Sequence, residues 1–205
     1  MNELDVERTL NDEWQALVEA ARTNPDLAAA TVDARGNRIT RPVLWAELED
    51  VRLAFAELHA ALDDTAAATL ATTRWSVRDV VVHLASWATE FSRQIETVAA
   101  GAAFDYLITF TPRIGPTAWN ARELDRRRSM SLDDAFREID IATGRIEELA
   151  LSLPDDLLFT AAELPQTPDG RPENRWRTRL ADLMLMKCWH DRYHLDRIRD
   201  LLLLE

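Results

Sequence analysis

The apolar residues of this 205-residue chain recur every three or four positions through several long stretches. That spacing places them on one face of an α-helix, whereas the alternating spacing typical of half-buried strands is nearly absent. Only five glycines interrupt a sequence that is rich in the good helix formers Ala, Leu, Glu and Arg. The pattern predicts an all-α fold without a β-sheet.

Start and stop signals divide these stretches into four long helices. Ser76 and Ser131 each precede an aspartate by three residues, which is the spacing of an N-cap and the first turn that it closes. Pro42 suits the first turn of another helix, and Pro154 would end the third. The four predicted helices cover about 42–62, 76–101, 131–153 and 176–204.

The beginning of the chain is predicted to be an addition to this bundle. A helical stretch covers about Leu4 to Arg22 and stops at Asn24-Pro25, because proline disfavours helical geometry in the residue before it. We therefore expect an N-terminal helical extension over 1–41 and a four-helix bundle over 42–205. One hydrophobic core is sufficient for a chain of this length.

The lengths of the connections carry topological information. Antiparallel neighbours in a bundle usually need roughly two to eight connecting residues. About thirty residues separate the second and third predicted helices, so we expect these two helices to run parallel. Residues 165–172 are rich in turn formers and predict an exposed loop before the fourth helix.

The charge balance restricts the partners that the chain can have. Its formal net charge of −12 disfavours nucleic acid and anionic lipid, because close approach of these polyanions would be repulsive. The acidic N-terminus does not resemble a secretory signal, and no apolar run approaches the roughly 18 residues of a membrane span. These features predict a cytoplasmic protein without membrane contact. The single cysteine, Cys188, permits no internal disulfide and is expected to be a small buried residue.

Histidines provide the clearest functional signal. His190 and His194 lie four residues apart in the fourth predicted helix, so their side chains emerge one turn apart on the same face. A helical wheel places both near the centre of the packing face, where a buried imidazole needs a hydrogen-bond or metal partner. His83, at the edge of the apolar stripe of the second helix, is a third candidate. Spacing alone leaves open one shared metal ion or three structural or surface histidines, and His59 is expected to be solvated.

Two segments carry a family resemblance. RWSVRDVVVHLASW (74–87) is similar to the second-helix motif of the DinB/YfiT-like superfamily of four-helix-bundle metalloenzymes, and HDRYH (190–194) is similar to its fourth-helix pair. The resemblance covers about Val43 to Leu204. The Trp119-Asn120 pair, followed by a helix, also resembles the related ClbS/DfsB group, whose members need not keep the three histidines.

The resemblance implies a bundle in up-down-down-up order, in which His83, His190 and His194 bind a divalent zinc or nickel ion. Some relatives are transferases or isomerases that use a low-molecular-weight thiol such as mycothiol or bacillithiol, and ClbS-like relatives are protective hydrolases. Three histidines leave at least one coordination position for water, a thiolate or substrate. The resemblance does not explain the extension before Pro42.

Two carboxylates are candidates for catalytic roles beside the histidines. Glu90 lies seven residues after His83, and Asp191 is adjacent to His190, so each could accept a proton or orient a ligand. A surface position for Glu90 and an ion pair with a surface cation for Asp191 are the alternatives.

Four further side chains are candidates for binding substrate at the mouth of the site. Aromatic residues at helical spacing also serve in cores, which is the alternative for three of them. The candidates are Trp87, Trp119, Asn120 and Tyr193.

These features favour a metal-dependent transferase that joins a small cellular thiol to a small-molecule electrophile in stress or detoxification. A hydrolase that uses metal-activated water is the close alternative. A third class is a non-enzymatic stress protein that binds a metal or ligand. A homodimer is also expected, since such bundles commonly associate in pairs.

Overall fold

The computed structural model describes residues 39–101, 116–159, 162–165 and 175–203. The predicted helix over Leu4 to Arg22 lies outside the described residues. So does most of the predicted loop over 165–172.

Seven helices and two short strands make up the described part of the chain. In chain order they are α3 (Arg41–Ala61), α4 (Asp64–Ala67), α5 (Val77–Ala99), α7 (Pro116–Arg126), α8 (Leu132–Ser152), α9 (Asp155–Phe159), β1 (Ala162–Pro165), β2 (Arg175–Thr178) and α10 (Leu180–Leu202). The four long helices are α3, α5, α8 and α10, and their bounds agree with the sequence prediction except at the start of α10.

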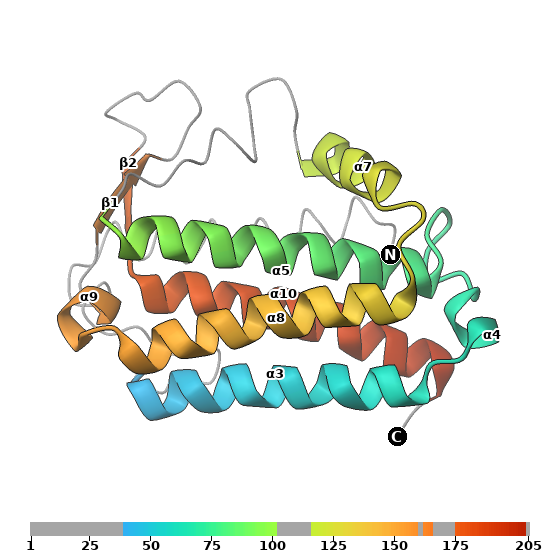
Figure 1. The fold of residues 1–205 in the computed structure, drawn as a ribbon, viewed down its shortest axis with the longest axis horizontal. Coiled ribbons are helices and arrows are strands. Elements are labelled where there is room, and N and C mark those ends of the chain that lie inside the picture. Colours follow the sequence, from blue (N-terminus) through green and yellow to red (C-terminus); the bar gives the residue numbers. More distant parts are fainter. Residues whose placement is uncertain (1–38, 102–115, 160–161, 166–174, 204–205) are drawn as a thin grey trace.

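The four long helices form a bundle in which each packs against two others. Helix α3 contacts α8 and α10, and α5 contacts the same two helices. Figure 1 shows that α5 and α8 run in one direction and that α3 and α10 run in the other. This is the up-down-down-up order, and it confirms that the second and third bundle helices are parallel.

Side chains at the helix ends explain where the elements begin. The Ser76 side chain accepts a hydrogen bond from the backbone of Asp79, whose carboxylate accepts one from the Ser76 backbone in return. Ser131 accepts the equivalent bond from the Asp134 backbone. These caps satisfy amide groups that have no partner within their own helix. Gly101 has a φ of 77° just after α5, where only a residue without a Cβ is unstrained.

The core lies between the four long helices and consists mostly of the predicted apolar faces. Leu44, Leu48 and Val51 of α3 are fully buried. Leu84 and Ile95 of α5 are buried in the same core. Leu201, near the end of α10, lies outside this core and is 40% exposed.

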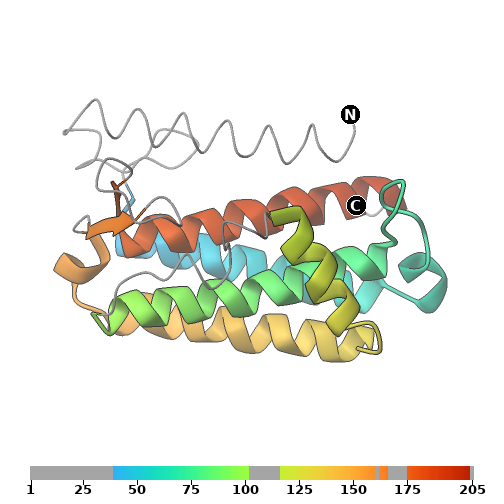
Figure 2. The ribbon, with the colours of Figure 1, turned by 90° about the horizontal axis from the view of Figure 1, so that it is seen from above.

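Two further differences concern the connections. Residues 176–178, expected to begin the last helix, instead belong to β2. This strand pairs antiparallel with β1 from Ala162↔Thr178 to Pro165↔Arg175. The expectation of no strand is therefore wrong at this hairpin, although the fold remains a helical bundle. The long connection between α5 and α8 contains α7, a helix that was not predicted. It carries the Trp119-Asn120 pair and crosses the outside of α5 (Figure 2).

None of the described helices is long and apolar enough to cross a membrane.

Candidate metal centre

Three histidines from two neighbouring antiparallel helices meet in the bundle. His83 comes from α5, and His190 and His194 come from α10. The ring centroids are 5.3 Å apart for His83 and His190, 5.0 Å for His83 and His194, and 4.9 Å for the α10 pair. One ring nitrogen of each histidine lies within 4.8 Å of the others. The three predicted ligands are thus brought together.

The helical positions of the three rings differ from the expectation in one respect. His83 is buried, but His190 and His194 are only partly buried, at the margin of the packed face of α10. The centre of that face is a stripe that includes Met184, Lys187 and Asp191. The two α10 rings therefore lie at the edge of the core, which is where a site can remain accessible to a ligand.

The donor set fits a zinc or nickel ion. Imidazole nitrogens are common ligands of both ions, and the three ring nitrogens lie within 4.8 Å of one another. His83 Nδ1 is buried and has no hydrogen-bond partner among the described residues. A buried ring nitrogen without a partner is costly, and a bound metal ion would offset that cost.

Burial keeps two of these rings in the form that binds metal. It lowers the pKa of His83 well below the usual value for imidazole, and His194 and His190 lower it further. Burial also lowers the pKa of His194, with additional lowering by His190 and Arg197. Both rings are consequently neutral at neutral pH, with a lone pair available for coordination.

Asp191 is fully buried and contacts His190. Its Oδ1 lies 3.2 Å from His190 Nδ1, and its Oδ2 lies 2.5 Å from the Nζ of Lys187, which is equally buried. Burial alone would raise the pKa of Asp191, but the charges of Lys187 and His190 and their hydrogen bonds lower it below its ordinary value. The alternative of an ion pair with a surface cation is wrong, since the partner is the interior Lys187.

Helix α7 brings two of the predicted substrate-binding residues to the site. Trp119 and Asn120 are both buried. The Trp119 ring lies 4.5 Å from that of Trp87, and Trp87 Nε1 donates a 3.0 Å hydrogen bond to Asn120 Oδ1. Trp87 in turn lies 5.7 Å from His190, so it links α7 to the histidines.

Tyr193 lies beside His194, the third predicted ligand. Its ring is 5.2 Å from that of His194, and its hydroxyl accepts a 2.5 Å hydrogen bond from Arg197. The Arg197 guanidinium also lies over the Tyr193 ring, 5.5 Å from its centroid. This pair places a positive charge next to the histidine cluster.

Glu90 is held by side chains of its own helix, α5. Its carboxylate accepts hydrogen bonds from Arg93 at 2.6 Å and from Gln94 at 2.7 Å, and its side chain is mostly buried. It does not belong to the set of ligand atoms around the histidines. The surface position considered from the sequence is also wrong.

Sequence reasoning did not identify all the neighbours of the histidines. The Trp75 ring lies 5.1 Å from His83, and the Phe91 ring lies 6.4 Å from His190. The sequence analysis gave Phe91 no role at the site, and Trp75 was part of the motif without a role. Helical spacing could have indicated Phe91, because it lies one turn beyond Trp87, whereas Trp75 precedes α5 and its position depends on the preceding loop.

The remaining histidine, His59, and the single cysteine, Cys188, have surroundings that explain them without a role at the histidine cluster. His59 is exposed, lies 2.9 Å from Asp133 Oδ1 and stacks on Phe136 at 4.3 Å. Cys188 is fully buried, and burial raises the pKa of its thiol to about 12, so it is protonated and unreactive at neutral pH.

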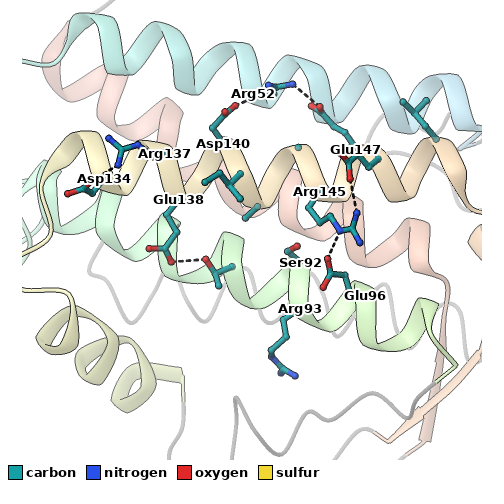
Figure 3. Close-up of a pocket in the computed structure, with 16 residues that line it drawn as sticks. Arg52, Ser92, Arg93, Glu96, Asp134, Arg137, Glu138, Asp140, Arg145 and Glu147 are labelled. Atoms are coloured by element: carbon teal, nitrogen blue, oxygen red, sulfur yellow. Dashed lines mark hydrogen bonds and ion pairs between the residues drawn. The ribbon is translucent and has the colours of Figure 1, made fainter.

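A separate groove of about 920 Å³ lies on the outer face of α5 and α8 (Figure 3). Its charged side chains pair across helices, as Arg52 does with Asp140 and Glu147, and as Arg145 does with Glu96. These pairs tie α3 and α5 to α8. None of the three clustered histidines lines this groove.

Comparison with known proteins agrees with the fold and with the motif around His83. A family of protein domains described as the mycothiol maleylpyruvate isomerase N-terminal domain matches residues 44–189. No curated protein and no solved structure matches the chain. The family match includes His83 and ends immediately before His190, so the case for the two α10 ligands rests on their geometry. The chain belongs to the mycothiol maleylpyruvate isomerase N-terminal domain family, within the DinB/YfiT-like superfamily of four-helix-bundle proteins.

Proposed function

We propose that this chain is a metal-dependent enzyme that joins a low-molecular-weight thiol to a small electrophile. The observation that carries the proposal is the cluster of His83, His190 and His194. Within the described part of the chain no fourth histidine, cysteine or carboxylate joins this cluster. A three-ligand set of this kind is typical of catalytic metal sites, which keep a position for a reactant.

In the proposed reaction the metal ion and the side chains of the protein have different roles. When bound, a zinc or nickel ion supplies Lewis acidity that lowers the pKa of a thiol or water beside it. The chain contributes neutral imidazoles, a carboxylate at Asp191 that orients His190, and the rings of Trp87 and Trp119. In the reaction the thiol sulfur forms a bond to the electrophilic carbon, the leaving group departs with its electron pair, and the thiol proton passes to solvent or a base.

A thiol is favoured over water by the chemistry of the family. The matched family is named after a mycothiol maleylpyruvate isomerase, and mycothiol is a small thiol. Fold-level likeness does not select a reaction by itself, so the hydrolase remains the comparison that the experiment must separate. Glu90, Asn120 and Tyr193 stay predictions as catalytic or substrate-contacting residues.

The test measures turnover with and without thiol. Purified protein loaded with zinc or nickel is incubated with monochlorobimane, a fluorogenic electrophile, in the presence or absence of mycothiol. We expect conjugation that requires both the thiol and the metal, is lost after chelation and returns when metal is restored. Circular dichroism should show that the chelated protein keeps its helices, because the core does not include the metal.

Matched histidine variants provide the control. His194→Ala should abolish conjugation, whereas His59→Ala should leave it unchanged because His59 lies outside the cluster. Thiol-independent hydrolysis of an ester or amide by the metal-loaded protein would favour the hydrolase instead. Metal-loaded protein without either activity would support the non-enzymatic class.

Two sequence predictions concern the setting of this activity. A cytoplasmic location would supply the reduced thiol that the reaction consumes. The expected homodimer is checked by light scattering of the purified protein, and a mass of one chain at micromolar concentration would contradict it.

A further inference from the structure

A lysine and an aspartate are completely buried in the middle of the bundle. Lys187 and Asp191 are both 0% exposed and lie one turn apart on α10. Lys187 Nζ lies 2.5 Å from Asp191 Oδ2 and donates a second hydrogen bond, of 2.9 Å, to Thr143 Oγ1 on α8. The other carboxylate oxygen of Asp191 lies 3.2 Å from His190 Nδ1.

Stability does not explain a buried ion pair at this position. Removing two charges from water is costly, and replacing such a pair with apolar residues of similar volume is often neutral or stabilising. The neighbouring positions of the same helical stripe, Met184 and Leu195, are apolar and buried. An apolar pair at 187 and 191 would continue that stripe, so the charged pair requires another reason.

The geometry of the carboxylate provides that reason. An ionised carboxylate only accepts hydrogen bonds, so the atom of His190 that faces Asp191 Oδ1 must be an N–H. With Nδ1 protonated, the neutral ring has its lone pair on Nε2. Lys187 holds the opposite oxygen of Asp191, and Thr143 holds Lys187 from a different helix.

We propose that Lys187, Asp191 and Thr143 form a positioning relay that fixes the tautomer and orientation of His190 for metal binding through Nε2. The relay rests on the proposed metal centre and gives it a rigid connection to α8. Asp191 acts through His190, and Lys187 acts through Asp191, so all three are positioning residues. Partners of this kind, one shell beyond the ligands, typically change metal affinity by about 10- to 100-fold when they are removed.

The test replaces the charged pair with apolar residues. In the double variant Lys187→Met with Asp191→Leu, both charges disappear together, so no buried charge is left unpaired. The matched control is Met184→Leu with Leu195→Met, two conservative exchanges of buried residues on the same helix. Zinc affinity is measured by competition with a chromophoric chelator, and unfolding by urea reports stability.

A spectroscopic measurement on metal-free protein separates positioning from packing. Long-range ¹⁵N–¹H correlation spectra report which ring nitrogen of His190 carries the proton. We expect the wild type and the control variant to hold the proton on Nδ1. The double variant should shift toward the Nε2–H form, bind zinc about 10- to 100-fold more weakly and unfold at no lower urea concentration.

The outcomes distinguish this inference from the proposed function. Wild-type affinity and an unchanged tautomer in the double variant would overturn the relay while leaving the metal centre intact. A wild type that binds no zinc or nickel would overturn the metal centre and the relay together. If the double variant does not fold, Thr143→Val removes only the anchor on α8. Thr143→Val should weaken zinc binding measurably, by a smaller factor than the 10- to 100-fold expected of the double variant. Unchanged zinc affinity in Thr143→Val would overturn the relay.

Discussion

Without a bound metal ion, burial of the His83 ring is costly in folding free energy. His83 is 4% exposed, its Nδ1 has no hydrogen-bond partner among the described residues, and burial lowers its pKa well below the usual value. A proton therefore binds His83 more weakly in the folded state than in the unfolded state. This difference makes the stability of the metal-free protein depend on pH.

The sign of that dependence follows from the depressed pKa. Above about pH 6.5, His83 is neutral in both states. Below it the unfolded state takes up a proton that the folded state does not, so acid favours unfolding. We expect wild-type metal-free protein to lose up to about 1.4 kcal/mol more per pH unit below 6.5 than His83→Leu does. Urea unfolding between pH 7.5 and 5 measures both slopes.

The exposed histidine supplies the comparison. His59→Leu should keep the steeper acid dependence because His83 remains in place. Equal slopes for the wild type and His83→Leu would show that burial of His83 does not govern the acid response.

At the residue scale the sequence predicted the three clustered histidines but not the residues that support them. The four-residue spacing of His190 and His194 follows directly from helical geometry. Lys187 was overlooked because lysine is normally exposed, although it and Asp191 fall in the apolar stripe that contains Met184. Which α8 side chain accepts the hydrogen bond from Lys187 depends on how α8 and α10 are rotated about their own axes. Local spacing does not determine that rotation.

At the element scale, side chains close α8 at both ends. Ser131 caps its first turn. The Arg41 side chain donates to the carbonyls of Ala150, Leu151 and Leu153 at its last turn. These bonds satisfy backbone groups that lack partners within the helix, and Arg41 also places a cation at the negative end of the helix dipole.

Removing the N-cap should therefore weaken the bundle without altering the site. Ser131→Ala is expected to cost about 1 kcal/mol of unfolding free energy, since Ser131 is exposed and contributes little packing. In a domain of this size that corresponds to a fall in Tm of roughly 2–4 °C. Thermal unfolding followed by circular dichroism measures it.

Ser152→Ala is the matched control, because Ser152 is also exposed and ends the same helix. It should change Tm by less than half as much. Equal effects of the two substitutions would mean that the Ser131 cap contributes nothing specific.

The helices with strong caps and long apolar stripes were predictable because those signals are local. The β1–β2 hairpin was not, since strands of four residues depend on pairing between residues distant in the chain. The position of α7 across α5 depends in the same way on contacts such as that between Trp119 and Trp87. The β1–β2 hairpin and α7 lie outside the four long helices that form the bundle.

At the scale of the whole molecule, the bundle and the proposed centre have separate sources of stability. Four helices bury a continuous apolar core, and cross-helix ion pairs tie their outer faces together (Figure 3). The histidines lie between α5 and α10 only, so the fold does not depend on a metal to join its helices. The whole account therefore depends on whether these three residues bind an ion.

The direct measurement is the metal content of purified protein, determined by elemental analysis after loading with zinc or nickel and removal of the excess. We expect one ion per chain in the wild type and in His59→Ala, and a sharp loss in His190→Ala, because His190 belongs to the cluster and His59 does not. Undiminished stoichiometry in His190→Ala, or equal loss in both variants, would contradict the assignment of His83, His190 and His194 as the ligands.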